Sequence, residues 1–387
     1  MSELDLVKVM PFFAPASRFG GVVSQAAKVC ALLAERGHRV RVVTTDNQIP
    51  EAFPRAQWID REGYQVYYAP TRPWNRTPPY WTPSIGPALE EAMEDARLCC
   101  LNVGLTLSNS IASRIARRHR VPFVYNAEGA LCPTRLRIKE WRKRAFLSLI
   151  ERPLLAGAAA CHATTAKEAR DLEAQGADPD HVFQVPNGVR IGEAGDGTAF
   201  RDRFGIPHDV PVLLFFGRLH AIKGLDVVVE AFAQAGLPKA KLVIAGHDED
   251  GTGARLREWV SRLGLESQTL FTGHLDGDDQ QDCLAAATAF ALASHSEGLP
   301  NAALEALAAG VPCVLSTQCN LPEVARARAG YVLPAKAEQF ATAFRSMLDD
   351  PSQQAEMGAN ARDLAETNFA LPVVVTRLER AYQALID

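Results

Sequence analysis

The stretch of sequence that decides the fold is residues 212–235, which read VLLFFGRLHAIKGLDVVVEAFAQA. Residues 212–216 form a short apolar run, which is typical of a strand buried in a parallel sheet. A helix is expected from Leu225 onward, and a loop bounded by Gly217 and Gly224 joins it to the strand. This order of strand, loop and helix predicts one repeat of a parallel sheet whose strands alternate with helices.

The same alternation extends in both directions along the chain. In the second half, further strands are expected at residues 241–245, 269–271, 289–293 and 313–316, and helices at 253–263, 278–286 and 302–309. In the first half, strands are expected at residues 6–10, 40–45, 66–69, 105–108, 121–125 and 158–163, and helices at 22–36, 87–98 and 111–119. Residues 190–211 are rich in Gly, Pro, Asp and Arg, which indicates an interdomain connection. The sequence therefore predicts two α/β domains, residues 1–190 and 191–370, with a C-terminal helix at about 371–387 that packs back on the first domain.

The length of the chain suggests two hydrophobic cores, and its composition excludes several classes of protein. A chain of 387 residues exceeds the size at which one hydrophobic core keeps growing. A net charge of -4 argues against a nucleic-acid-binding protein, which needs a basic surface. No apolar run is long enough to span a membrane, and the acidic start does not fit a secretory signal, so a cytoplasmic protein is expected. The eight cysteines include no Cys-x-x-Cys pair and are expected to be reduced, mostly buried thiols.

The loop of the opening stretch carries a pair of cations, Arg218 and Lys223. The loop follows a strand, and ligands of open parallel sheets bind beyond the carboxyl ends of the strands. A forked guanidinium, an ammonium group and the N-terminus of the next helix together suit a diphosphate. The plainer interpretation is that both side chains are solvated loop residues, and this motif alone leaves both interpretations open.

A second motif, residues 297–305, places two carboxylates on either side of an expected helix start. Glu297 lies in the loop, and Glu305 lies one turn inside a helix that begins near Asn301. Backbone N–H groups at such a start favour phosphate, whereas Glu305 could accept hydrogen bonds from paired ribose hydroxyls. The alternative is that Glu297 only favours the positive end of the helix and Glu305 is a surface charge.

A third motif, Gly20-Gly21, lies between the first expected strand and the first expected helix. Glycine at this place lets the backbone approach a ligand where a Cβ atom would clash. The signal is weak by itself, because any tight turn can use glycine. It is not a nicotinamide-dinucleotide fingerprint, because the nearest Gly-x-Gly, Gly251-Thr252-Gly253, has Leu256 where the third glycine belongs.

In this order along the chain, the motifs resemble those of the retaining GT-B glycosyltransferases of family 4, also called glycosyl transferases group 1. The resemblance spans nearly the whole chain and is most specific in residues 212–330. The matching segments there are Gly217-Arg218, Lys223-Gly224, Leu242-Val243-Ile244-Ala245-Gly246, Phe271-Thr272-Gly273, Glu297 to Glu305, Ala309-Gly310-Val311-Pro312 and Leu321-Pro322-Glu323. The resemblance implies a GT-B fold of two Rossmann-like domains that face a cleft. It places the acceptor on residues 1–190 and the nucleotide sugar on residues 191–370.

The resemblance also implies roles for single residues. Arg218 and Lys223 would neutralise the departing diphosphate in place of a metal ion, so neither a metal nor another cofactor is expected. Glu297 would meet the donor sugar near the reacting carbon, and Glu305 would hold the ribose. The loops after Ala245 and Phe271 would receive the base. The other implied donor-binding positions are Gly20, Gly21, Asn187, Gly217, Gly246, Thr272, Gly298, Leu299, Pro300 and Asn301.

The resemblance indicates the classes of the substrates but not their identities. The donor is expected to be a UDP- or GDP-linked sugar, and the acceptor a glycan or lipid-linked hydroxyl. Bacterial cell-surface polysaccharide or lipopolysaccharide assembly is the commonest role among similar chains. In such a retaining mechanism the acceptor hydroxyl attacks the face that the diphosphate leaves, and the diphosphate takes the proton.

One segment departs from the family. Many relatives carry a His just before the glycine that follows the fourth or fifth strand of the first domain, whereas this chain reads Asn126-Ala127-Glu128-Gly129. Glu128 or Asn126 is therefore expected to contact the sugar or the acceptor, and Glu128 is counted among the catalytic residues.

A basic segment runs from Arg135 to Arg144 and contains Trp141. It could contact anionic lipid at the inner face of the plasma membrane, or grip an anionic acceptor. The alternative is a solvated helix face whose Trp141 packs inward.

Three other functions fit part of the sequence. A metal-dependent GT-A transferase needs an Asp-x-Asp motif, and the pattern occurs at Asp248, Asp178 and Asp276, so it is too common to be specific. A nucleotide-sugar epimerase of the GT-B fold would release free nucleotide without any acceptor. A two-domain sugar-binding protein of a transport system would share the α/β alternation but would not explain paired cations and paired carboxylates.

Overall fold

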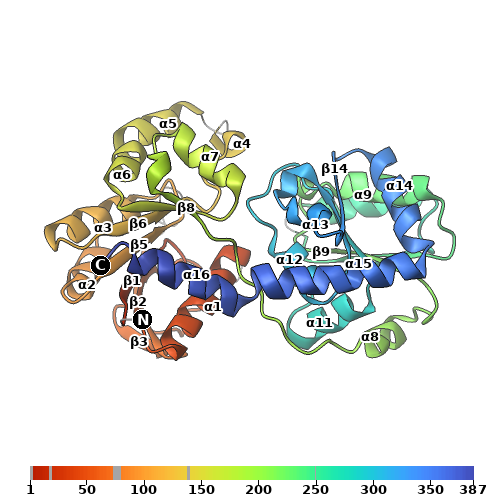
Figure 1. Ribbon diagram of the computed structural model, residues 1–387, viewed down its shortest axis with the longest axis horizontal. Coiled ribbons are helices and arrows are strands. Elements are labelled where there is room, and N and C mark those ends of the chain that lie inside the picture. Colours follow the sequence, from red (N-terminus) through yellow and green to blue (C-terminus); the bar gives the residue numbers. More distant parts are fainter. Residues whose placement is uncertain (1–2, 17–19, 73–79, 137–139, 249) are drawn as a thin grey trace. The chain divides into compact units, whose positions relative to one another are not determined.

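The computed structural model describes residues 3–16, 20–72, 80–136, 140–248 and 250–387, apart from the side chains of residues 140–142. The chain divides into two compact units (Figure 1). Unit 1 comprises Met1–Gly188 and Leu371–Asp387, and unit 2 comprises Val189–Ala370. These limits lie close to the boundaries expected at residues 190 and 370. Each unit is a Rossmann-like domain built on a parallel sheet.

The sheet of unit 1 has eight strands in the order β3-β4-β2-β1-β5-β6-β7-β8. All neighbouring strands are parallel except β3 and β4, which pair antiparallel. The strands are β1 Asp5–Val9, β2 Arg39–Thr45, β3 Trp58–Arg61, β4 Tyr64–Ala69, β5 Leu98–Asn102, β6 Phe123–Asn126, β7 Ala160–Ala163 and β8 Val182–Gln184. The short, apolar sequences of the inner strands suit burial on both faces, which parallel sheets require.

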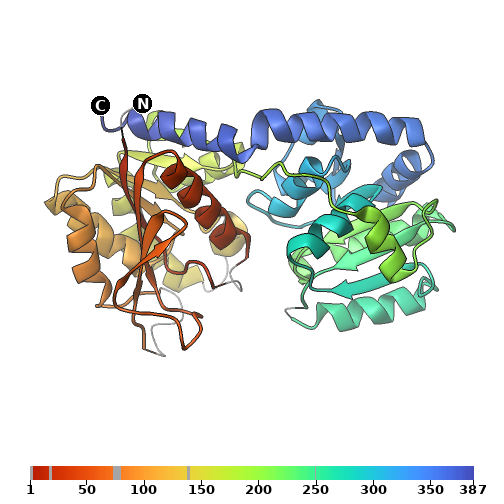
Figure 2. The same cartoon turned by 90° about the horizontal axis from the view of Figure 1, so that it is seen from below.

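Helices cover both faces of this sheet (Figure 2). They are α1 Gly21–Glu35, α2 Ile85–Met93, α3 Leu107–Arg118, α4 Pro133–Leu136, α5 Glu140–Phe146, α6 Arg152–Gly157, α7 Ala166–Ala174 and α16 Leu371–Gln383, with a π-helical turn, η3, at Leu147–Glu151 and a 3-10 turn, η4, at Pro179–His181. The C-terminal helix α16 packs beside α1. Glu379 of α16 pairs there with Arg36 at 2.6 Å and with His38 at 3.0 Å.

The strand expected at residues 105–108 is wrong. The strand is β5, Leu98–Asn102, and residues 107 and 108 already belong to helix α3. Cys99 and Cys100 lie in the middle of β5 and are fully or almost fully buried. Cysteine behaves as a small hydrophobe when it is buried, so these residues belong to an apolar strand rather than to a helix end.

The sheet of unit 2 has six parallel strands in the order β11-β10-β9-β12-β13-β14. They are β9 Val212–Phe216, β10 Lys241–Ala245, β11 Thr269–Gly273, β12 Ala289–Leu292, β13 Cys313–Ser316 and β14 Gly330–Leu333. The α-helices are α8 Gly197–Phe204, α9 Leu225–Ala235, α10 Thr252–Arg262, α11 Gly277–Ala286, α12 Asn301–Ala308, α13 Glu323–Arg326, α14 Ala337–Leu348 and α15 Pro351–Leu364. Shorter turns are η5 Ala221–Lys223, η6 Thr317–Cys319 and η7 Ala365–Phe369. The order places β12 directly beside β9, so the loops that follow these two strands meet.

All eight cysteines are buried free thiols, as the sequence predicts. Burial raises the pKa of Cys30 to about 11, which makes its thiolate, the reactive form, scarce at neutral pH. In the part of the chain that the structure describes, every helix is too short or too polar to cross a membrane.

Candidate functional site

The loops after β9 and β12 bring together two of the residues singled out from the sequence. The Lys223 ammonium group donates a 2.6 Å hydrogen bond to Glu297 Oε1, and the two side chains are only 17% and 13% exposed. The Ser294 hydroxyl, which is buried at the end of β12, donates to the same carboxylate oxygen at 2.7 Å. A charge-assisted pair at the carboxyl ends of two adjacent strands is therefore the centre of the candidate site.

The backbone around Lys223 explains how this ammonium group reaches Glu297. Residues Ala221–Lys223 form the 3-10 turn η5, and the ring of His220 accepts a hydrogen bond from the Ile222 N–H at 3.1 Å. Gly224 follows with a positive φ of 64°, and a Cβ atom there would lie 2.0 Å from the Ala293 carbonyl oxygen. Only glycine allows this contact, which presses the turn against the end of β12.

Hydrogen bonds to and from its backbone hold the loop that carries Glu297 in place. The Asn320 side-chain amide donates to the carbonyl oxygens of Glu297 at 2.7 Å and Gly298 at 3.1 Å. The Glu297 N–H donates to the Gln318 carbonyl oxygen at 3.2 Å. The chain then passes through the buried Leu299 and Pro300 and enters α12 at Asn301. The N-terminus of α12 thus follows directly on the Lys223–Glu297 pair.

The other predicted residues of unit 2 lie on neighbouring elements. Glu305 is partly exposed on α12 and accepts a 2.9 Å hydrogen bond from the Gln280 amide of α11. Arg218 is exposed in the turn after β9, one residue beyond Gly217, whose N–H donates to the Ala245 carbonyl oxygen at 3.0 Å. The structure thus brings Lys223 and Glu297 into contact and gives Glu305 a partner on a different helix.

A pocket of about 360 Å³ opens at the carboxyl ends of β10 and β11, where the sequence predicts the site of the base. Its lining includes Gly246, Asp248, Gly253, Arg257, Phe271 and His274. Thr272, a predicted donor-binding residue, is absent from the lining of this described pocket, although both of its neighbours contribute to it. Strand residues alternate between the two faces of a sheet, which separates Thr272 from Phe271 and Gly273.

In unit 1, Gly20 has a positive φ of 63° and caps α1, and Gly21 is the first residue of the helix. Phe19, which precedes them in the predicted motif, lies outside the described residues. Asn187 is partly exposed three residues after the end of β8, close to the end of the main segment of unit 1. The glycine pair therefore occupies the expected turn between strand and helix.

A row of polar side chains crosses the carboxyl ends of β5, β6 and β7. Asn102 and Asn126 are paired in register, and the Asn126 amide lies 3.0 Å from His162 Nδ1. His162 Nε2 lies 2.7 Å from the Val185 carbonyl oxygen, so Nε2 carries the proton and Nδ1 accepts from Asn126. Burial lowers the pKa of His162. His162 is therefore a buried histidine whose two ring nitrogens both have hydrogen-bond partners.

Glu128 stands beside this row in a backbone conformation that most residues avoid. Its φ is 52°, and its N–H donates to Asn126 Oδ1 at 3.0 Å. The next N–H, that of Gly129, donates to Glu168 Oε1 at 2.7 Å, and Asn102 donates weakly to Glu128 Oε1 at 3.4 Å. Burial, followed by the nearby Glu168 carboxylate, raises the pKa of Glu128 to about 7. Strain of this kind persists where the surrounding structure fixes a side chain in place.

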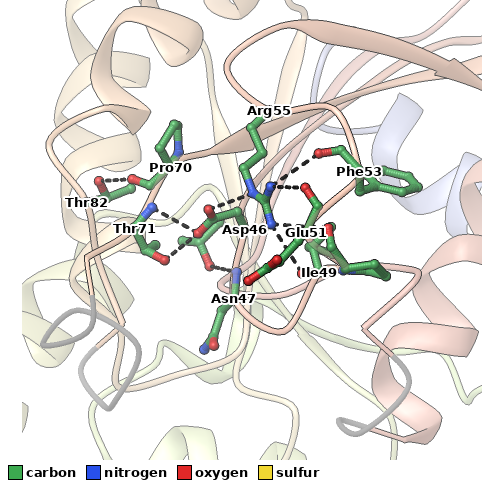
Figure 3. A network of polar contacts seen from close by, with 11 residues as sticks. Asp46, Asn47, Ile49, Glu51, Phe53, Arg55, Pro70, Thr71 and Thr82 are labelled. Atoms are coloured by element: carbon green, nitrogen blue, oxygen red, sulfur yellow. Dashed lines mark hydrogen bonds and ion pairs between the residues drawn. The ribbon is translucent and has the colours of Figure 1, made fainter.

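A separate polar network orders the loop after β2 (Figure 3). The buried carboxylate of Asp46 accepts a 2.9 Å hydrogen bond from the Thr71 N–H and lies 3.0 Å from Arg55 Nε. The same guanidinium donates to the carbonyl oxygens of Glu51 at 2.8 Å and Pro50 at 3.2 Å. The ion pair between the partly exposed Arg55 and the buried Asp46 therefore helps to fix the shape of residues 46–55.

The basic segment is described only in part, because residues 137–139 and the side chains of 140–142, Trp141 included, lie outside the described residues. Lys143 donates a hydrogen bond to the Arg135 carbonyl oxygen. Beyond the segment, Leu149 of the π-helical turn is 76% exposed, with the exposed Arg144 and Arg152 near it in sequence. In the described part, an exposed apolar side chain thus lies between two exposed cations in the sequence.

Two of the Asp-x-Asp patterns have local structural partners. Asp178 accepts a 3.1 Å hydrogen bond from the Asp180 N–H at the start of η4, and Asp250 accepts one of 3.1 Å from the Thr252 N–H at the start of α10. The Asp178 carboxylate thus caps η4, and the Asp250 carboxylate accepts from the first N–H of α10. Among the residues that the structure describes, no three His, Cys, Asp or Glu side chains gather in an arrangement that suits a metal ion.

Ser294, Gln280, Asn320 and Asn102 were missed by the sequence analysis. Each is polar, and Ser294 and Asn102 directly follow apolar strand residues, which is a usable signal for the carboxyl end of a strand. The partners of Gln280 and Asn320 depend on tertiary contacts between elements that are distant in sequence.

Two family models match most of the chain. The model described as "Glycosyl transferase 4-like domain" matches residues 20–188, and the model described as "Glycosyl transferases group 1" matches residues 196–364. The first match falls in unit 1 and the second in unit 2.

Similar proteins match half or more of the chain. The D-inositol 3-phosphate glycosyltransferase of Stackebrandtia nassauensis is 28% identical over 372 residues, which cover 89% of this chain and 83% of that protein. The GDP-mannose-dependent monoacylated alpha-(1-6)-phosphatidylinositol monomannoside mannosyltransferase of Corynebacterium glutamicum is 31% identical over 217 residues, 52% of this chain and 55% of that protein. Among solved structures, HepE of Anabaena in complex with UDP and glucose has a TM-score of 0.77 at 17% identity, over 99% of this chain and 100% of that one. At this identity the structural likeness concerns the fold alone.

Proposed function

Because the chain belongs to the glycosyl transferases group 1 family of GT-B enzymes, we propose that it moves a sugar from a nucleoside diphosphate to an acceptor hydroxyl, with retention and without a metal ion. The observation that carries this proposal is the 2.6 Å pair between Lys223 and Glu297. A cation for the diphosphate and a carboxylate for the sugar stand together at the ends of β9 and β12.

Lys223 and Arg218 supply the charge that a metal ion would otherwise supply. As the bond between the sugar and the diphosphate breaks, negative charge grows on the departing diphosphate, and fixed cations stabilise that charge. Lys223 is largely buried, so its attraction to phosphate is screened less than that of a surface lysine. Arg218 is exposed on the same turn and adds a forked donor.

Glu297 acts on the sugar side of the site. Its Oε1 already accepts hydrogen bonds from Lys223 and Ser294, which orient the carboxylate and leave Oε2 to accept from a sugar hydroxyl. The acceptor hydroxyl attacks the face of the sugar that the diphosphate leaves, and the diphosphate oxygen takes the hydroxyl proton. Glu305 holds the ribose, exchanging its present partner Gln280 for ribose hydroxyls.

Unit 1 carries the acceptor, and its contribution centres on Glu128 and Asn126. Glu128 is fixed by Asn126 and by the Glu168 contact to Gly129, so it can receive a hydroxyl group without further ordering. The acceptor is a glycan or a lipid-linked hydroxyl, and the product belongs to bacterial cell-surface polysaccharide or lipopolysaccharide assembly. No cofactor takes part beyond the nucleotide sugar itself, which is UDP- or GDP-linked.

The enzyme contacts the inner face of the plasma membrane through the surface around Leu149. An exposed Leu flanked by Arg144 and Arg152 combines apolar insertion with attraction to anionic headgroups. Vesicles that contain anionic lipid should sediment the wild-type protein at low salt, and Leu149→Glu should reduce the bound fraction severalfold. Equal sedimentation of both proteins would remove this surface from the account.

The transfer reaction is tested with UDP- and GDP-linked hexoses in excess EDTA, with and without glycan and lipid-linked acceptors. Nucleotide release that depends on an acceptor, together with a product whose anomeric NMR coupling matches that of the donor, is the expected result. Release of free nucleotide without any acceptor would indicate an epimerase instead, and activity that EDTA abolishes would contradict the metal-free site.

A further inference from the structure

The pocket at the carboxyl ends of β10 and β11 contains a carboxylate, that of Asp248. A Cβ atom on Gly253, in the first turn of α10, would lie 2.8 Å from Asp248 Oδ2. Glycine at position 253 therefore makes the room in which this carboxylate lies. The pocket, at about 360 Å³, has the size of a small-ligand site.

A cation lines the same pocket. Arg257 lies one turn further along α10, and its guanidinium carbon is 4.1 Å from the centre of the Phe271 ring of β11. Stacking on an aromatic face holds the guanidinium in a defined plane. Leu219 and Ile244, both buried, complete an apolar wall. One pocket thus offers an acceptor group, a donor group and an apolar wall.

The three common bases of nucleotide sugars differ in how they match these groups. Guanine presents two adjacent N–H donors, N1–H and the 2-amino group, which suit the two oxygens of a carboxylate, and its O6 and N7 suit an arginine. Uracil has a single N–H between two carbonyl oxygens, which a carboxylate repels. Adenine has an amino group but no second donor beside it on the ring.

We propose that this pocket selects guanine, so that the sugar donor is linked to GDP. The inference rests on the proposed function, because it names the base held by the same nucleotide site. Asp248 is the residue that determines the specificity, and Arg257 supports it from the opposite edge of the base. A competing explanation is that Asp248 only stabilises the positive N-terminus of α10, which would give no preference among bases.

The test compares the dissociation constants of GDP, IDP, UDP and ADP, measured calorimetrically on the full chain. IDP lacks only the 2-amino group of GDP, so the ratio of their constants isolates one of the two hydrogen bonds to the carboxylate. The variants are Asp248→Asn and, as a matched control, Glu258→Gln, which removes a carboxylate from the exposed face of α10, the helix that follows Asp248.

GDP should bind the wild type about tenfold or more tightly than IDP, and more tightly still than UDP or ADP. Asp248→Asn should bring the GDP and IDP constants together, whereas Glu258→Gln should leave their ratio unchanged. Tighter binding of UDP or ADP, or an unchanged ratio in Asp248→Asn, would overturn the base assignment alone. Failure of all four nucleotides to bind the wild type would instead contradict the proposed function.

Discussion

Replacing Glu128 by glutamine should remove a pH-dependent loss of stability from unit 1. The pKa of this carboxyl is raised from 4.5 to about 7, first by burial and then by the Glu168 carboxylate. The unfolded chain therefore releases the proton near pH 4.5, whereas the folded chain keeps it until about pH 7. Between these values the folded state binds more protons, so stability falls as the pH rises.

The size of this loss follows from the change in pKa. A rise from 4.5 to about 7 corresponds to about 3 kcal/mol of unfolding free energy at pH 8. Glu128 is partly exposed, and solvent screening reduces this figure, so we expect about 1 to 3 kcal/mol. Glutamine has nearly the same shape and keeps an oxygen that can accept the weak hydrogen bond from Asn102.

The assay is urea unfolding at pH 5, 6, 7 and 8, followed by tryptophan fluorescence. Four of the five tryptophans belong to unit 1, so the signal reports mainly on that unit. Glu128→Gln should come closest to the wild type at pH 5 and exceed it progressively up to pH 8. Glu94→Gln, an exposed carboxylate of the same unit, is the control and should change little. If the unfolding free energies of the wild type and Glu128→Gln change in parallel from pH 5 to pH 8, the pKa of Glu128 is not raised in the folded chain.

Three further predictions concern the site and the Asp46 network. Lys223→Ala should weaken nucleotide binding at least about tenfold without unfolding the chain, as should Glu305→Ala, and calorimetry that finds unchanged affinity would remove these residues from the site. Glu297→Gln should lower kcat far more than nucleotide affinity, and steady-state kinetics that find only a KM change would contradict its place beside the sugar. Arg55→Ala leaves the buried Asp46 carboxylate without its cation, so the free energy of unfolding should fall by about 2 kcal/mol or more. The control is Arg326→Ala, whose ion pair with Glu323 is exposed and whose loss should cost under about 0.5 kcal/mol. Equal losses in the two variants would be evidence against the network.

Strands with uniform apolar sequence were predictable. The segment 212–235 forms β9, η5 and α9, and both β9 and α9 have the expected limits. The apolar strand, the amphipathic helix and the glycines of the turn between them all indicate the same boundaries. β5 was misplaced because its two cysteines and its C-terminal Asn102 make the apolar pattern of this short strand difficult to recognise. β3, β8 and β14 were missed because edge strands are half-exposed and carry mixed side chains.

The candidate site was predictable as a set of motifs but not as a set of contacts. Lys223 and Glu297 are 74 residues apart, and their contact depends on β12 lying beside β9, an order that local patterns do not specify. The pKa of Glu128 likewise depends on Glu168, which reaches it from α7. Local sequence predicts which side chains reach the carboxyl ends of strands, and the strand order decides which of them meet.

The most direct test of a metal-free diphosphate site is calorimetric binding of UDP and GDP in excess EDTA, to the wild type and to Arg218→Ala. One nucleotide should bind the wild type with the same dissociation constant in EDTA and in Mg²⁺, and should bind the variant at least about tenfold more weakly. Binding that appears only when Mg²⁺ or Mn²⁺ is restored, or that Arg218→Ala leaves unchanged, would contradict a diphosphate site built from this chain's own cations.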